Sequence, residues 1–189
     1  MIEVELKARL EDRAAVEARV ASFAAPAGAV DKLDAYWHGP EWRLQRGAKG
    51  FRLRKEGERC VVTFKSKRSE GGIEINRERE FEISDPEAFV EFAYRIGCEP
   101  FYTKRKRGLK FVAEAEGGIG PATIEIIEVQ GLGDFIEIEV LLLEEDPMAI
   151  SLAEGEIRGL LARAGVGAEA IESRYYSELM MAAGIVARP

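Results

Sequence analysis

The chain has 189 residues and a mass of 21.0 kDa, which is enough for one domain with its own apolar core. Lys and Arg number 27 against 34 Asp and Glu, and the resulting net charge of −7 argues against general nucleic-acid binding, which requires a basic surface. The two cysteines form no C-x-x-C pair, so they exclude a disulfide framework and a structural zinc site and predict two buried thiols.

The N-terminal segment carries charges from position 3 and has no apolar core of the kind that a signal peptide needs. The longest uncharged stretch, residues 20–30, contains Pro26 and is too short to cross a membrane. We therefore expect a cytoplasmic protein that does not associate with membranes.

The first half of the chain is dominated by strands. Residues 2–7 alternate Ile, Val and Leu with Glu and Lys, which predicts a strand, and the Ala- and Val-rich stretch 12–23 predicts a helix. A weaker strand pattern follows at 34–37. Period-two alternation then predicts three more strands, at 51–54, 62–67 and 73–83.

The second half mixes strands with helices. Asp85-Pro86 supplies a helix N-cap and a first-turn proline, and Gly97 stands where such a helix would end. Strand patterns follow at 101–112, 123–129 and 135–140, then a helix from Asp146-Pro147 toward Gly165 and a last helix over about 168–183. This mixture predicts an α+β fold with an antiparallel sheet, and about eight strands are compatible with a closed β-barrel.

The charged residues of the strands are sorted by sign. Glu3 and Glu5 form an acidic doublet, as do Glu137 and Glu139, whereas Arg52-Leu53-Arg54 is basic. One interpretation is a sheet with a solvated face on which opposite charges pair across strands. The other is a closed interior in which carboxylates hold Mg²⁺ or Mn²⁺ and basic side chains hold phosphates, because a charged ligand would neutralise both sets.

A series of motifs runs in order along the chain. They are Glu3-Val4-Glu5-Leu6-Lys7, Asp34-Ala35-Tyr36-Trp37, Phe51-Arg52-Leu53-Arg54, Thr63-Phe64-Lys65, Arg77-Glu78-Arg79-Glu80, Lys104-Arg105-Lys106-Arg107, residues 129–139 and Tyr176-Ser177-Glu178-Leu179. From residue 3 to about 179 this order resembles the CYTH domains, also called triphosphate tunnel metalloenzymes.

The resemblance implies one tunnel domain over residues 1–189, a closed eight-stranded antiparallel β-barrel whose C-terminal helices, about 148–183, pack on it. It implies Mg²⁺ or Mn²⁺ as the cofactor, and Lys7 and Lys65 as catalytic residues. The metal ligands would be Glu3, Glu5, Glu78, Glu80, Glu137 and Glu139. The phosphate-binding residues would be Lys7, Arg52, Arg54, Lys65, Arg105 and Arg107.

Two positions depart from the family pattern. Ile127 stands where the family usually has an aspartate, and Glu125 or Glu128 could replace that carboxylate. Around residues 104–107, motif spacing directs Arg105 and Arg107 inward, whereas alternation with Leu109 and Phe111 directs the two lysines inward. His38, the only histidine, is interpreted as a loop residue.

The expected function is metal-dependent hydrolysis of inorganic, thiamine or nucleoside triphosphate. One alternative is a class IV adenylate cyclase that converts ATP to cyclic AMP and pyrophosphate, and another is a non-enzymatic module that binds polyphosphate or nucleotides. The partner would be a small-molecule triphosphate rather than a nucleic acid. The apolar residues of the last two helices could cover the barrel or form a homodimer interface.

Overall fold

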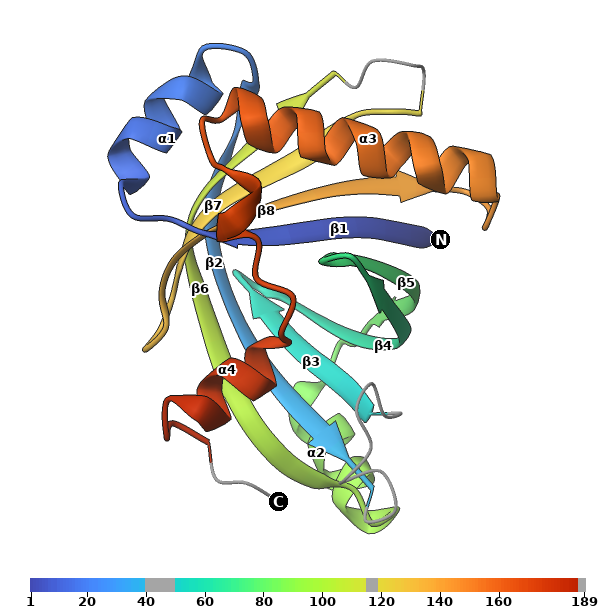
Figure 1. Cartoon of the computed structure of the whole chain (residues 1–189). Coiled ribbons are helices and arrows are strands. Elements are labelled where there is room, and N and C mark those ends of the chain that lie inside the picture. Colours follow the sequence, from blue (N-terminus) through green and yellow to red (C-terminus); the bar gives the residue numbers. More distant parts are fainter. Residues whose placement is uncertain (40–49, 115–118, 187–189) are drawn as a thin grey trace.

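The computed structural model describes residues 1–39, 50–114 and 119–186. Within these ranges the strands form one closed antiparallel barrel in the order β1-β5-β4-β3-β2-β6-β7-β8, which confirms the expected α+β barrel (Figure 1). The strands are β1 (Ile2–Arg9), β2 (Ala25–His38), β3 (Gly50–Glu56), β4 (Arg59–Glu70), β5 (Ile73–Glu82), β6 (Glu99–Ala113), β7 (Ala122–Val129) and β8 (Gly133–Leu142).

The helices begin where the sequence signals them. Asp12, Asp85 and Asp146 each accept a hydrogen bond from a backbone N–H three residues on, which satisfies one of the free donors of the first turn. They cap α1 (Arg13–Ala21), α2 (Pro86–Arg95) and α3 (Pro147–Arg163), and the chain continues with a 3₁₀ turn, η2 (Ala168–Ala170), and α4 (Tyr176–Ala182).

The main apolar core lies outside the barrel, between the sheet and the helices. Ile2, Val4 and Leu6 of β1 are buried in one cluster with Ile157 and Leu160 of α3, which crosses β1 and β8 (Figure 1). Each such side chain contributes roughly 1.5–3 kcal/mol when it is fully buried. Because neighbouring side chains of a strand point to opposite faces, the charged residues between them are directed into the barrel.

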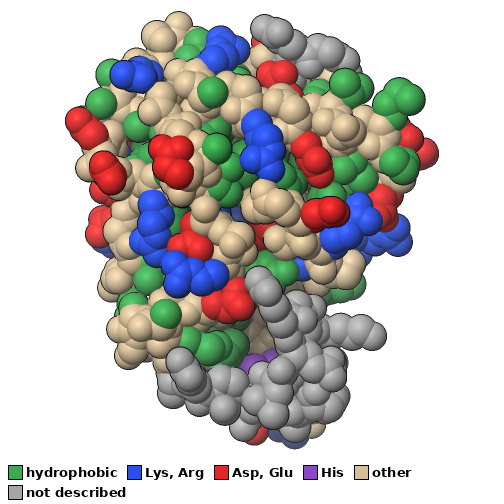
Figure 2. Space-filling model, viewed as in Figure 1, with side chains coloured by type: hydrophobic (Ala, Val, Ile, Leu, Met, Phe, Trp, Pro, Cys, Tyr) green, Lys and Arg blue, Asp and Glu red, His purple; other side chains and the backbone are tan. Residues whose placement is uncertain are grey.

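Three smaller findings complete the description. Cys60 and Cys98 are buried free thiols, as the composition predicted. No helix within the described ranges is long and apolar enough to cross a membrane. On the face shown in Figure 2, basic and acidic side chains lie next to one another rather than in separate areas.

Two predictions about the elements are wrong. His38 is not a loop residue: β2 begins at Ala25 and runs through His38, paired with β6 along its length. The chain after η2 is not one helix, because Ile171 forms a β-bridge with Ala8 and the N–H of Glu172 donates to the carbonyl of Lys7. The backbone groups of Ile171 and Glu172 therefore pair with the end of β1 and do not form the hydrogen bonds of a continuous helix.

Candidate functional site

The barrel encloses a charged cavity of about 810 Å³, called the tunnel below. Most of its charges come from alternating positions of the strands. The acidic side chains in its lining are Glu3 and Glu5 of β1, Glu74, Glu78 and Glu80 of β5, Glu125 of β7, Glu137 and Glu139 of β8, and Glu178 of α4. The basic ones are Lys7, Lys32, Arg52, Arg54, Lys65, Lys67, Arg79, Lys104 and Lys106. Of the two interpretations of the strand charges, the structure therefore supports the closed, charged interior.

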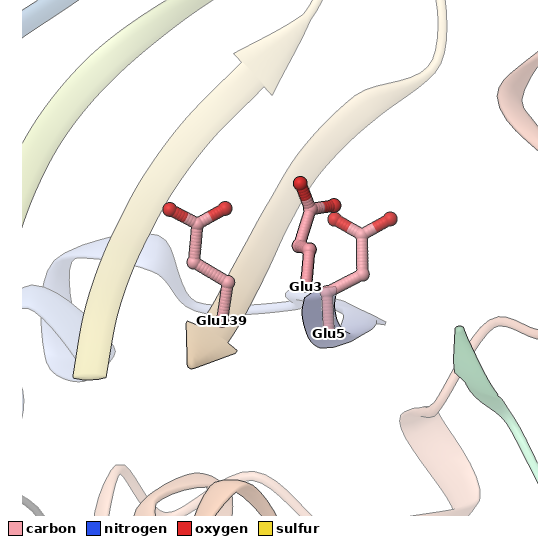
Figure 3. Close-up of side chains that lie close together, drawn as sticks. All are labelled: Glu3, Glu5 and Glu139. Atoms are coloured by element: carbon pink, nitrogen blue, oxygen red, sulfur yellow. The ribbon is translucent and has the colours of Figure 1, made fainter. Parts of the chain in front are cut away.

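Three of the predicted metal ligands gather at one place. Glu3, Glu5 and Glu139 can each offer an oxygen within 4.8 Å of the other two, and their carboxylates project in the same direction from β1 and β8 (Figure 3). The amide of Asn76 donates to Glu3 at 3.0 Å and to Glu5 at 3.1 Å, while its own buried Oδ1 has no hydrogen-bond partner among the described residues.

The electrostatics of this acidic cluster favour a cation. Burial, and next the Glu5 carboxylate, raise the pKa of Glu3 well above its usual value. Burial, and next Glu5 and Glu125, raise the pKa of Glu139 to about 7. Within the described ranges, Glu139 has no ion-pair partner. Three carboxylates, of which Glu3 and Glu5 share one nearby ammonium, that of Lys65, together with an orphaned amide oxygen, are the kind of donor set that Mg²⁺ or Mn²⁺ takes.

The other predicted ligands, Glu78, Glu80 and Glu137, each have a close cationic partner of their own. Glu137 accepts hydrogen bonds from Lys106 at 2.7 and 2.5 Å and from the Tyr176 hydroxyl at 2.6 Å. Although burial opposes ionisation, Lys106 and Lys104 lower the pKa of Glu137 to about 2. Glu78 pairs with Lys65 at 2.5 Å, and half-exposed Glu80 accepts from Arg52 at 3.2 Å.

The predicted phosphate-binding residues on β1, β3 and β4 all line the tunnel. Lys65 lies 3.3 Å from Glu3, so its ammonium borders the acidic cluster. Arg54 donates to the fully buried Asp34 at 2.7 and 2.9 Å, which fixes its guanidinium. Lys7 pairs with Glu74 at 2.6 Å. The buried Nε of Arg52 has no acceptor among the described residues.

The inward register predicted from motif spacing for β6 is wrong. Arg105 and Arg107 lie on the outer face of the barrel, where both pair with Asp31 and their side chains are 37% and 60% exposed. Lys104 and Lys106 line the tunnel instead, as the alternation with Leu109 and Phe111 requires. A one-residue difference in register exchanges the two faces of a strand, so the two arginines cannot hold a ligand in the tunnel.

Several tunnel residues were not singled out as site residues from the sequence. Glu74 and Asn76 lie on the same face of β5 as Glu78, and the alternation of β5 could have identified them. Lys32 also lines the tunnel and pairs closely with Glu125. Of the two carboxylates that could replace the aspartate missing at Ile127, Glu125 lines the tunnel and Glu128 is exposed. The alternation over residues 62–67 puts Lys67 on the same face as Lys65, and Tyr176 was identified only as part of the terminal motif.

Tyr176 reaches the tunnel from α4. Its ring centroid lies 4.3 to 5.5 Å from the ammonium groups of Lys7, Lys104 and Lys106. Burial, and next the charge of Lys106, lower the pKa of Lys104 well below its usual value. Lys7 and Lys106 pair with Glu74 and Glu137, whereas the nearest carboxylate to the Lys104 ammonium, that of Asp34, lies 3.6 Å away. A negatively charged ligand would therefore offset the cost of burying Lys104 as a cation.

The profile of the CYTH domain matches residues 1–176. The chain belongs to the CYTH domain family. No curated protein matches the sequence. Among solved structures, a conserved hypothetical protein from Pyrococcus furiosus is 29% identical, with a TM-score of 0.74 over 94% of this chain and 99% of that chain.

Two further structures show the same fold. A candidate adenylate cyclase from Vibrio parahaemolyticus is 19% identical, with a TM-score of 0.77 over 95% of this CYTH chain and 98% of that chain. HpAC1 from Hippeastrum, a candidate adenylyl cyclase described as having a dominant triphosphatase activity, is 17% identical, with a TM-score of 0.59 over 96% of both chains.

Proposed function

We propose that this CYTH protein is a divalent-metal-dependent triphosphatase that hydrolyses inorganic, thiamine or nucleoside triphosphate in its tunnel. One observation carries the proposal: a cluster of three carboxylates and a set of lysines and arginines line the same enclosed cavity. On a solvated sheet face, the carboxylates and the basic side chains would both remain exposed to water. A triphosphate with its metal ion supplies the complementary charges.

Glu3, Glu5 and Glu139 would hold the metal, since their oxygens lie within 4.8 Å of one another and the pKa of Glu139 is raised to about 7. Mg²⁺ and Mn²⁺ both suit a site made of oxygens. When bound, the ion would polarise phosphate oxygens and orient the attacking water.

The basic residues would bind and orient the phosphates. Arg52 offers its unpartnered Nε, and Lys65 borders both the acidic cluster and Glu78. Lys7 and Lys65 would act as the catalytic residues by stabilising the charge that develops on the transferred phosphoryl group. Lys104 and Lys106 would take the place that motif spacing had given to the two arginines of β6.

Hydrolysis requires only that water reach the terminal phosphorus, whereas cyclisation requires a bound adenosine with its ribose aimed at the α-phosphorus. One observation keeps the cyclase as the second candidate. Tyr36 and Tyr102 stack at 4.4 Å with an interplanar angle of 6°, and both rings line the tunnel together with Phe101. Aromatic faces of this kind could hold a base.

The test is incubation of the purified protein with Mg²⁺ or Mn²⁺ and, separately, ATP, inorganic triphosphate and thiamine triphosphate. Phosphorus NMR and a cyclic AMP assay would identify the products. Orthophosphate without cyclic AMP is expected, and it should disappear with Glu3→Gln but persist with Glu128→Gln, an exposed control. Cyclic AMP with pyrophosphate would establish the cyclase, and the absence of any product would leave the tunnel as a binding site.

A further inference from the structure

A second cavity, of about 720 Å³, lies where the β4–β5 hairpin meets α3 and residues 168–175. It is called the outer cavity below, and its lining includes Lys67, Ser69, Gly72, Arg158, Ser173 and Tyr175. Lys67 and Tyr175 also line the tunnel, with the Lys67 ammonium 4.7 Å from the centre of the Tyr175 ring. The two cavities therefore share this pair of side chains as a boundary.

The lining of the outer cavity contains two cations and no carboxylate. Lys67 shares its charge with Glu74 on the tunnel side, at 2.9 Å. Arg158 donates to the carbonyl of Gly71 at 2.7 Å and has no ion-pair partner within the described ranges. A guanidinium has five N–H donors, so most of those on Arg158 are available to a ligand.

The remaining lining is polar and held in place. Gly71 and Gly72 have φ values of +57° and +82°, the left-handed conformation that a two-residue hairpin turn requires. A Cβ at Gly72 would lie 2.7 Å from Cγ2 of Ile171, so the turn packs tightly against the segment after η2. The hydroxyls of Ser69 and Ser173 add donors beside this wall.

We propose that the outer cavity is a second anion site, which binds inorganic phosphate or pyrophosphate through Arg158 and Lys67. Charge-assisted hydrogen bonds from an arginine fork suit a phosphate group, and no lining carboxylate repels it. The site itself stands on this geometry, whereas the identity of its anion rests on the proposed function, because hydrolysis in the neighbouring tunnel would release such anions beside Lys67.

The experiment titrates metal-free protein with pyrophosphate and, separately, with orthophosphate, and follows the backbone amides of Gly71 and Gly72 by ¹⁵N NMR. These amides should shift in the wild type and in Arg163→Gln, a control on the same helix that does not line the cavity. Arg158→Gln should weaken the binding about tenfold, as loss of a charged hydrogen bond predicts. Arg158→Lys, which retains the charge, should weaken it less.

Arg52→Gln separates the two cavities, because it alters the tunnel alone and should leave the affinity seen at Gly71 and Gly72 unchanged. The proposal is overturned if wild-type Gly71 and Gly72 do not respond to either anion, or if their response is independent of Arg158. It is also overturned if Arg52→Gln abolishes the response, since the amides would then report tunnel binding. Failure of the proposed function would leave an Arg158-dependent response intact while no triphosphate is hydrolysed.

Discussion

Replacing Glu139 with glutamine removes one of three clustered carboxylates while nearly preserving the size of the side chain. In EDTA at pH 8, where no divalent ion compensates the cluster, we expect this variant to be more stable than the wild type. The reason is the pKa of about 7 at Glu139, against 4.5 for an ordinary glutamate. Between these pH values the folded protein retains a proton that the unfolded chain has released, so the wild type loses stability as the pH rises.

The size of the effect follows from that shift. One pKa unit corresponds to about 1.4 kcal/mol, which gives an upper value of about 3 kcal/mol above pH 7. The Glu5 carboxylate contributes to the raised pKa of Glu139, so the two groups titrate together. We therefore expect the substitution to raise the free energy of unfolding by roughly 1–3 kcal/mol. For a chain of this length the melting temperature should rise by about 2–12 °C.

The assay is thermal unfolding by circular dichroism at pH 5 and pH 8, with EDTA or with Mg²⁺. Metal-free Glu139→Gln should melt above the wild type at pH 8 and close to it at pH 5, and Mg²⁺ should stabilise only the wild type. Glu128→Gln, on an exposed position of β7, should behave as the wild type throughout. A metal-free Glu139→Gln that melts at or below the wild type at pH 8 would refute the reasoning.

Three other substitutions test separate parts of the site. Asp34→Asn leaves the buried guanidinium of Arg54 without its carboxylate and should cost about 3–5 kcal/mol in urea unfolding; a cost below about 1 kcal/mol would contradict a structural role for the pair. Lys106→Met should lower kcat/KM for the triphosphate substrate about 100-fold, whereas Arg105→Met on the outer face should change it less than about twofold, and the reverse result would restore the motif-based register. Tyr176→Phe removes a hydroxyl that donates to a tunnel carboxylate and should lower the stability by about 1.5–3 kcal/mol, measured by urea unfolding; unchanged stability would show that this hydrogen bond contributes nothing.

The alternation of apolar and charged residues was sufficient to predict most of the barrel and two of the three carboxylates of the acidic cluster. Glu3 and Glu5 are one strand's inward pair, and their shared face follows from the two-residue period alone. The partnership with Glu139 depends on which strands become neighbours, and the sequence showed this only through the family resemblance. Pairing of Glu5 with Glu139 across β1 and β8 is a consequence of barrel closure.

Two of the errors have different causes. The extended chain at Ile171 is determined by its bridge to Ala8, which no helix propensity within 168–183 reveals. The error at Arg105 came from motif spacing, because the local alternation with Leu109 and Phe111 gives the correct face. In this register Gly108 fits closely against β7, where a Cβ would lie 1.9 Å from the carbonyl oxygen of Ile126. The contact of Glu137 with Lys106 became apparent only once the register was known.

The closure of the barrel also governs the order in which the protein can assemble during synthesis. Strand β1 is synthesised before the other strands of the barrel, its neighbours are β5 and β8, and Ile2 pairs with Leu142. Until β8 is made, one edge of β1 and its apolar outer face have no native partner, which is the situation in which nascent chains aggregate. The strand that carries Glu3 and Glu5 is therefore synthesised before the other strands of the barrel and acquires its last neighbour only with β8, so the acidic cluster forms only after β8 has been made.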